Sequence, residues 1–209
     1  MRKLIVFIFI ACIVLSRAGM AAAEEQAPET PRRADLALQT GIVLPQVASH
    51  LGSAVGIRLD VGVRLGGRLS VFGAVGYSQP GVSHSQSDPR LAAGDYTTST
   101  TQRELTLATG LVWRFLPMTG TFNVYAGLGA KVYLLETITS GSSSGQSFGE
   151  NRETSTRSGA TGLGGLEYRL GFGAACAELE LGGSDLPHLI TGDVATTAVA
   201  FTVGYRLFF

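Results

Sequence analysis

The sequence predicts an all-β protein, an eight-stranded antiparallel up-and-down transmembrane β-barrel. Three observations support this prediction. Apolar residues alternate with small or polar ones at a period of two, which is the period of a β-strand. The segments that join the alternating runs are short and long in turn. The less apolar face of the runs is mostly Gly, Ala, Ser and Thr, which suits the crowded interior of a narrow barrel.

Composition excludes several other classes of protein. Only 15% of the residues are charged and the formal net charge is zero, so we expect no nucleic-acid partner. After residue 23 no apolar run approaches the ~20 residues that a transmembrane helix needs. Cys12 lies in the first apolar run, which leaves Cys176 without a partner for an intrachain disulfide. A lipid-modified Cys12 is an alternative, but the apolar run continues past it, unlike the pattern of a lipoprotein.

The chain begins with a predicted signal peptide over residues 1–23. Arg2 and Lys3 precede the apolar run Leu4–Leu15, and Ala21–Ala23 follow, which is the order of a secretory signal. Residues 24–34 show no periodicity and are polar, so they predict a disordered periplasmic tail. The barrel itself is predicted over residues 35–209.

The strands follow from the alternation, which is clearest over Ala54–Leu65 and Ala198–Phe209. Glycines weaken the pattern of the sixth strand, and ten strands are an alternative to eight. The eight predicted strands are 35–44, 53–65, 68–78, 101–115, 121–136, 158–169, 172–182 and 194–209.

The joins predict which strand ends lie together. Joins two, four and six are short turns, whereas the others are longer, and the longest of these, 79–100 and 137–157, are polar. Short turns at one end and long loops at the other are typical of outer-membrane barrels. The aliphatic face should then meet lipid. Aromatic residues on that face predict a girdle near the short turns: Trp113, Phe115, Phe122, Tyr168, Tyr205 and Phe209, with Tyr77 at the opposite interface.

Two segments carry a resemblance to a known family. The chain ends on Phe209, with apolar or aromatic residues at every second position before it, and this end is similar to the C-terminal recognition strand of bacterial outer-membrane proteins. The stretch Tyr125–Lys131 resembles strands of the small eight-stranded barrels of the OmpA, OmpX and opacity type. The resemblance covers residues 35–209.

This resemblance implies an address and a set of partners. The protein is expected in the bacterial outer membrane as a monomer surrounded by lipid, with both termini in the periplasm. Periplasmic chaperones and the barrel-assembly machinery would handle it during biogenesis, with Tyr205, Leu207 and Phe209 as the assembly signal.

The inward-facing positions carry the candidate site. Charges inside a narrow barrel must be paired, so we expect an ionic network that fills the lumen, and Glu167 and Arg169 share its face. A narrow channel or a proton-linked switch is the alternative use of such a network. Its predicted members are Arg58, Asp60, Arg64, Glu104, Arg114, Lys131, Glu178, Glu180 and Arg206.

We predict no catalytic residue, metal or cofactor. His50, His84 and His188 fall in predicted loops without metal-ligand spacing, and Ser184, Asp185 and His188 are the only local Ser/Asp/His grouping. The expected role is therefore structural or one of surface interaction, such as adhesion or resistance, in which loops 79–100 and 137–157 meet an extracellular ligand. The alternatives are a lipid A or phospholipid hydrolase or acyltransferase, and a small channel.

Overall fold

The computed structural model describes residues 33–45, 51–87, 95–117, 120–143, 146–185 and 195–209. The predicted signal peptide and nearly all of the predicted tail lie outside these ranges, although Ala34 already belongs to the first strand. None of the described residues forms a helix that is long and apolar enough to cross a membrane. The described strands are β1 (Ala34–Pro45), β2 (Ala54–Gly66), β3 (Leu69–Ser78), β4 (Gly81–Ser87), β5 (Asp95–Arg114), β6 (Phe122–Ser143), β7 (Gln146–Leu170), β8 (Gly173–Asp185) and β9 (Ala195–Phe208).

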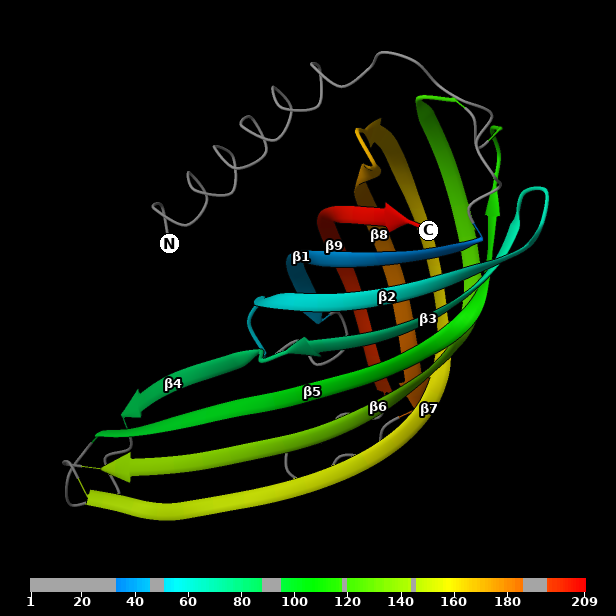
Figure 1. The fold of residues 1–209 in the computed structure, drawn as a ribbon. Coiled ribbons are helices and arrows are strands. Elements are labelled where there is room, and N and C mark those ends of the chain that lie inside the picture. The colour runs from blue at the N-terminus through cyan, green and yellow to red at the C-terminus, as the bar shows by residue number, and fades with distance from the viewer. Residues whose placement is uncertain (1–32, 46–50, 88–94, 118–119, 144–145, 186–194) are drawn as a thin grey trace.

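The strands close into an antiparallel ring (Figure 1). β1 pairs with β2 on one side and with β9 on the other, and β3 pairs with β5. β4 continues the line of β3 along β5, after an interruption at Pro80, which has no N–H to donate. Eight of the nine described strands therefore make the ring, and β4 prolongs one of them. The predicted all-β transmembrane barrel is confirmed.

One end of the barrel, the terminal end, holds the tight turns and the first and last residues of the described chain, Arg33 and Phe209. The backbone N–H groups of Ala34 and Phe209 each donate to the other's carbonyl oxygen, at 3.2 and 2.9 Å. Gly67 (φ 48°) and Gly171 (φ 61°) turn the chain between β2 and β3 and between β7 and β8, in a conformation that favours glycine. The turns predicted to be short thus lie together beside the chain ends (Figure 1).

At the other end, four strands run on beyond the ring as a protruding sheet, the arm (Figure 1). We define the arm as residues 81–87, 95–103, 136–143 and 146–154. The prediction that 79–100 and 137–157 are loops is therefore wrong over most of their length, because these residues form strands. Their Ser and Thr residues pair in register across β4, β5, β6 and β7. Hydrophobic alternation overlooked this sheet because both of its faces are polar.

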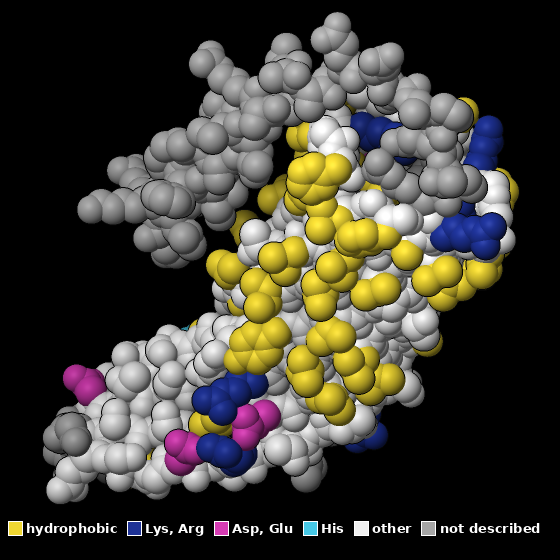
Figure 2. Space-filling view, in the orientation of Figure 1, with side chains coloured by type: hydrophobic (Ala, Val, Ile, Leu, Met, Phe, Trp, Pro, Cys, Tyr) yellow, Lys and Arg dark blue, Asp and Glu magenta, His cyan; other side chains and the backbone are white. Residues whose placement is uncertain are grey.

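The outer face of the ring is apolar, and yellow side chains cover the barrel wall in Figure 2. Exposed aliphatic side chains such as Leu38, Val55 and Leu128 alternate with inward residues along each strand. The expected girdle residue Trp113 is 47% exposed on this face. Such a continuous apolar belt is unfavourable in water and favourable in lipid.

Inside the ring, polar side chains fill the space that glycines leave open. Tyr125, only 1% exposed, lies against Gly165 of the neighbouring strand. A Cβ atom on Gly165 would lie 2.3 Å from Cζ of Tyr125, whereas a Cβ on Gly164 would meet nothing closer than 3.9 Å. The glycine at position 165 is thus required by packing.

We predict that Gly165→Ala destabilises the barrel and that Gly164→Ala does not. The added methyl group overlaps the Tyr125 ring, and overpacking of this kind costs about 1–3 kcal/mol. Urea unfolding of the protein refolded in lipid vesicles measures the difference. Equal unfolding midpoints for the two variants would contradict the packing argument.

Candidate functional site

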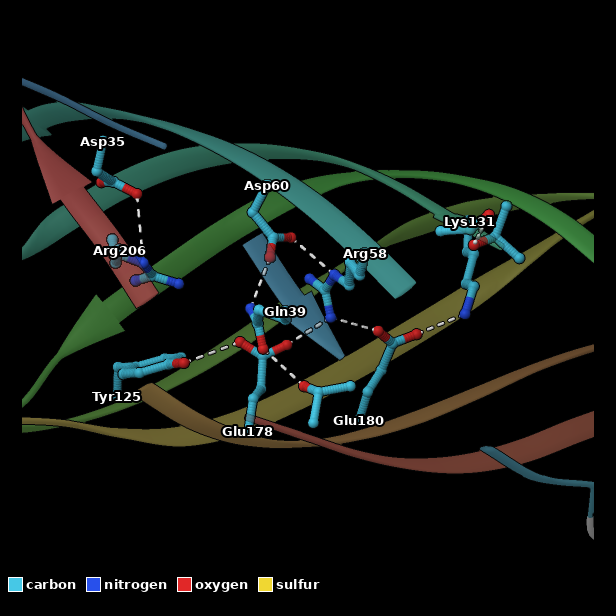
Figure 3. A network of polar contacts seen from close by, with 12 residues as sticks. Asp35, Gln39, Arg58, Asp60, Tyr125, Lys131, Glu178, Glu180 and Arg206 are labelled. Carbon is cyan, nitrogen blue, oxygen red and sulfur yellow. Dashed lines mark hydrogen bonds and ion pairs between the residues drawn. The ribbon is translucent and has the colours of Figure 1, made fainter. Parts of the chain in front are cut away.

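Arg58 of β2 is the centre of the polar network in the lumen (Figure 3). Its Nη1 atom donates to Glu178 Oε1 and, at 2.5 Å, to Glu180 Oε2, both on β8. Its Nε atom donates to Asp60 Oδ1 at 2.7 Å. Since β1 and β9 separate β2 from β8 in the ring, Arg58 reaches across the lumen rather than along its wall.

The carboxylates around Arg58 have further partners from other strands. Lys131 Nζ donates to Glu180 Oε1 at 2.5 Å, and the Tyr125 hydroxyl donates to Glu178 Oε2 at 2.9 Å. Gln39 donates from Nε2 to Asp60 Oδ2 at 2.6 Å and accepts at Oε1 from the Thr202 hydroxyl. This central cluster therefore ties β1, β2, β6, β8 and β9 together.

A second cluster lies between the first and the terminal end. Arg114 donates from Nε and Nη2 to the two oxygens of Glu167, both at 3.3 Å, and from Nη1 to the Ser70 hydroxyl at 2.8 Å. Arg206 also pairs with Glu167, and its Nε lies 3.5 Å from Asp35 Oδ1. The ring of Tyr125 lies 5.2 Å from the guanidinium of Arg206 and 6.0 Å from that of Arg114, so Tyr125 links the two clusters.

The nine predicted network residues are thus placed as follows. Five lie in the central cluster and two in the second cluster. Glu104 is buried on β5 and Arg64 lies at the terminal end; neither forms an ion pair with another described residue. The central cluster holds Arg58, Asp60, Lys131, Glu178 and Glu180, and the second holds Arg114 and Arg206.

Sequence reasoning did not include Asp35, Gln39 or Tyr125 in the network. Gln39 and Tyr125 occupy inward positions of their strands, so the alternation itself contained the signal. They were overlooked because only charged residues were considered. Neutral donors matter here, since a buried carboxylate needs hydrogen bonds as well as a counter-charge.

The arrangement joins opposite walls of the lumen through ion pairs. Glu178 and Glu180 both bind Arg58, as expected of structural carboxylates and not of an acid–base pair. The Ser184 hydroxyl donates to the Ser158 carbonyl oxygen at 2.6 Å, while the Asp185 side chain and His188 lie outside the described part of the chain. Among the described residues, no three His, Cys, Asp or Glu side chains form a group that could bind a metal ion. The lack of a metal, a cofactor and an enzymatic activity stays a prediction.

The arm presents a second candidate surface. On its outer face Glu136 accepts a hydrogen bond from Arg103 at 3.0 Å and forms an ion pair with Arg152 at 2.9 Å. Arg152 also pairs with Glu150. Hydroxyl pairs join neighbouring strands farther out, such as Ser83 with Ser99. β7 pairs with β8 only from residue 160 onward, so within the described residues no strand pairs with the β7 edge over 146–157.

The predicted assembly signal lies on β9, next to β1. Leu207 faces Leu36 and Tyr205 faces Leu38 in the seam that closes the ring. Phe209 is exposed at the terminal end, and the Tyr205 hydroxyl donates to the Leu170 carbonyl oxygen at 2.5 Å. Recognition of these residues by an assembly machinery stays a prediction. Of the three histidines, His84 lies on β4, and His50 and His188 lie outside the described residues.

A family model described as the outer membrane protein beta-barrel domain matches residues 10–206. None of the curated proteins compared matches the sequence. Among solved structures, the chain is similar to a major outer membrane protein from Thermus thermophilus, with 10% identity and a TM-score of 0.53 over 83% of this chain and 99% of that chain. That likeness concerns the fold alone.

Two further solved structures are similar at lower TM-scores. Ail, the attachment invasion locus protein of Yersinia pestis, has 15% identity and a TM-score of 0.49, with 85% of this chain and 100% of that chain covered. Neisserial surface protein A has 16% identity and a TM-score of 0.47, with 84% of this chain and 96% of that chain covered. Likenesses at this level add nothing to the shared fold.

We predict that Arg58→Ala strongly destabilises the barrel. It leaves three carboxylates without their shared cation, and breaking a buried ion pair from one side costs about 3–5 kcal/mol. Arg103→Ala is the matched control, because its side chain is 48% exposed and exposed pairs contribute about 0–1 kcal/mol. Denaturant unfolding in vesicles compares the two, and a similar loss for both would contradict a structural role of the central cluster.

We also predict that the intact protein conducts no ions. Arg58 meets Glu178 and Glu180 from the opposite wall of the lumen, and Lys131 binds Glu180 as well, so the charges of the central cluster are bound to one another. Single-channel recordings in planar bilayers should therefore stay flat. Discrete conductance steps that change in Arg58→Ala would instead support the channel hypothesis.

Proposed function

The chain belongs to the outer membrane protein β-barrel family. We propose that it interacts with partners at the cell surface through its arm, in a role such as adhesion or resistance. Membership of the family places the protein in the bacterial outer membrane. The observation that carries the proposal is the polar sheet that continues four strands of the barrel beyond the apolar belt.

Orientation follows the usual plan of such barrels. Their short turns lie in the periplasm and their long connections lie outside the cell. The terminal end of this barrel holds the tight turns and both described chain ends, so we assign it to the periplasm. The arm then projects from the cell surface.

The arm is suited to contact another macromolecule. Two sheet edges, that of β4 and that of β7 over 146–157, have no strand paired with them among the described residues. An unpaired edge offers a row of backbone N–H and C=O groups, which an extended peptide can join as an added strand. Ser and Thr hydroxyl groups on the outer face add hydrogen-bonding capacity without a strong charge.

The lumen supports this role over the alternatives. Its ion pairs stabilise the scaffold and join side chains from opposite walls of a narrow interior. The barrel would therefore act as the membrane anchor, and the arm as the functional part. The other partners that we propose are outer-membrane lipid, periplasmic chaperones and the barrel-assembly machinery, with the protein as a monomer.

We predict that shortening the β6–β7 hairpin removes surface binding without unfolding the barrel. Replacing residues 139–151 by Asn-Gly cuts the hairpin at the pair Ile138–Arg152, outside the ring, and provides a tight turn. Cells that display each variant are tested for attachment to an epithelial monolayer and for survival in serum. The shortened variant should lose the function while it keeps the heat-modifiable mobility of a folded barrel.

Arg103→Gln with Glu136→Gln is the control, because it alters the charged ladder but keeps both strands at full length. The control should retain attachment or survival. Full activity of the shortened variant in both assays would contradict the proposed role of the arm.

A further inference from the structure

A ring of arginines surrounds the lumen at the terminal end. Two of its members, Arg114 and Arg206, are buried and paired with Asp35 and Glu167. Four more lie at strand ends nearer the rim, two of them, Arg33 and Arg68, exposed and two partly buried. The six arginines of the ring are Arg33, Arg64, Arg68, Arg114, Arg169 and Arg206.

Backbone hydrogen bonds fix these residues at one level of the barrel. The N–H of Arg64 donates to the Arg33 carbonyl oxygen at 2.8 Å, and the N–H of Arg114 donates to that of Arg68 at 2.9 Å. On the far side, the N–H of Arg169 donates to the Thr121 carbonyl oxygen at 2.7 Å. The arginines therefore follow from the strand register and not from the chance position of a flexible loop.

The charges at this end are unbalanced. Among the described residues, Asp35 and Glu167 are the acidic side chains of the terminal end, and both already bind Arg114 or Arg206. Figure 2 shows dark-blue side chains without magenta ones at this end, whereas both colours occur together at the base of the arm. The rim is thus electropositive, and its guanidinium groups match phosphate in geometry.

The ring lies at the depth of the aromatic girdle. Trp113 and Tyr168 point outward directly before Arg114 and Arg169 in the sequence, and Leu69, next to Arg68, is the cross-strand neighbour of Trp113. Girdle aromatics mark the headgroup region of the bilayer. We propose that the terminal rim, through Arg33, Arg64 and Arg68, binds phosphate groups.

Two sources can present that phosphate, an anionic phospholipid headgroup beside the girdle or a soluble phosphate compound at the mouth of the lumen. The proposal does not depend on the role of the arm. Trp113 is the only tryptophan of the chain, so its fluorescence reports lipid next to the ring.

The test places the folded protein in phosphatidylcholine vesicles that contain a minor fraction of brominated phosphatidylglycerol or, for comparison, the same fraction of brominated phosphatidylcholine. Bromine quenches Trp113 on contact. We expect quenching to show about fivefold enrichment of phosphatidylglycerol, as about 1 kcal/mol from an arginine would give. The enrichment should fall in the double variant Arg33→Gln with Arg68→Gln and in the threefold variant that adds Arg64→Gln. It should not fall in Arg103→Gln with Arg152→Gln at the other end.

A second arm of the test adds inorganic phosphate to the protein in a neutral detergent and follows the arginine Nε–H resonances. Saturable shifts of the rim arginines, without enrichment of phosphatidylglycerol, would assign the site to a soluble phosphate. If the threefold variant does not fold, the double variant still tests the proposal, because Arg33 and Arg68 are both exposed. Absence of both effects, or an enrichment that the rim variants leave unchanged, would overturn the proposal.

Discussion

Closure of the strand ring is the constraint on which the rest of this structure depends. In hydrocarbon every backbone N–H and C=O group needs a partner within the protein, and only a closed sheet supplies one on both sides of each strand. The seam between β1 and β9 and the pairing of β3 with β5 provide that closure. Strand alternation then sends one half of the side chains into lipid and the other half into a narrow interior, where they must fill the space and neutralise one another.

The interior satisfies this demand with two linked polar clusters beside a small apolar cluster, which is formed by Phe72, Ala74, Val112, Tyr125 and Leu163. Arg58 reaches across the lumen to β8, while Arg114 and Arg206 share Glu167 nearer the terminal end. Tyr125 connects them through its hydroxyl and its ring, and Gly165 leaves the space that the ring occupies. The cost of removing these charges from water is offset because each is paired and most receive further hydrogen bonds.

Beyond the apolar belt the strands remain paired, but their side chains become polar. In the arm both faces are polar, so pairing depends on backbone hydrogen bonds and cross-strand contacts such as those of Glu136 with Arg103 and Arg152. The barrel thus carries a polar sheet that projects beyond its apolar belt. At the opposite end, the arginine ring brings positive charge to the terminal rim.

Alternation in the sequence is enough to predict the barrel. The pattern over 53–65 predicted β2 (Ala54–Gly66) to within a residue at each end. The odd or even position of a residue along its strand also identified the inward face that Arg58, Glu178 and Lys131 share. Parity cannot tell which residues meet across the lumen, because that depends on the closed ring and its register. The pairing of Arg58 with Glu178 and Glu180 therefore emerges from the folded ring alone. The same holds for the hydrogen bonds that Gln39 donates to Asp60 and Tyr125 donates to Glu178. The tertiary structure also decided that 81–87 and most of 137–157 are strands, since a sheet with two polar faces has no hydrophobic period by which to find it.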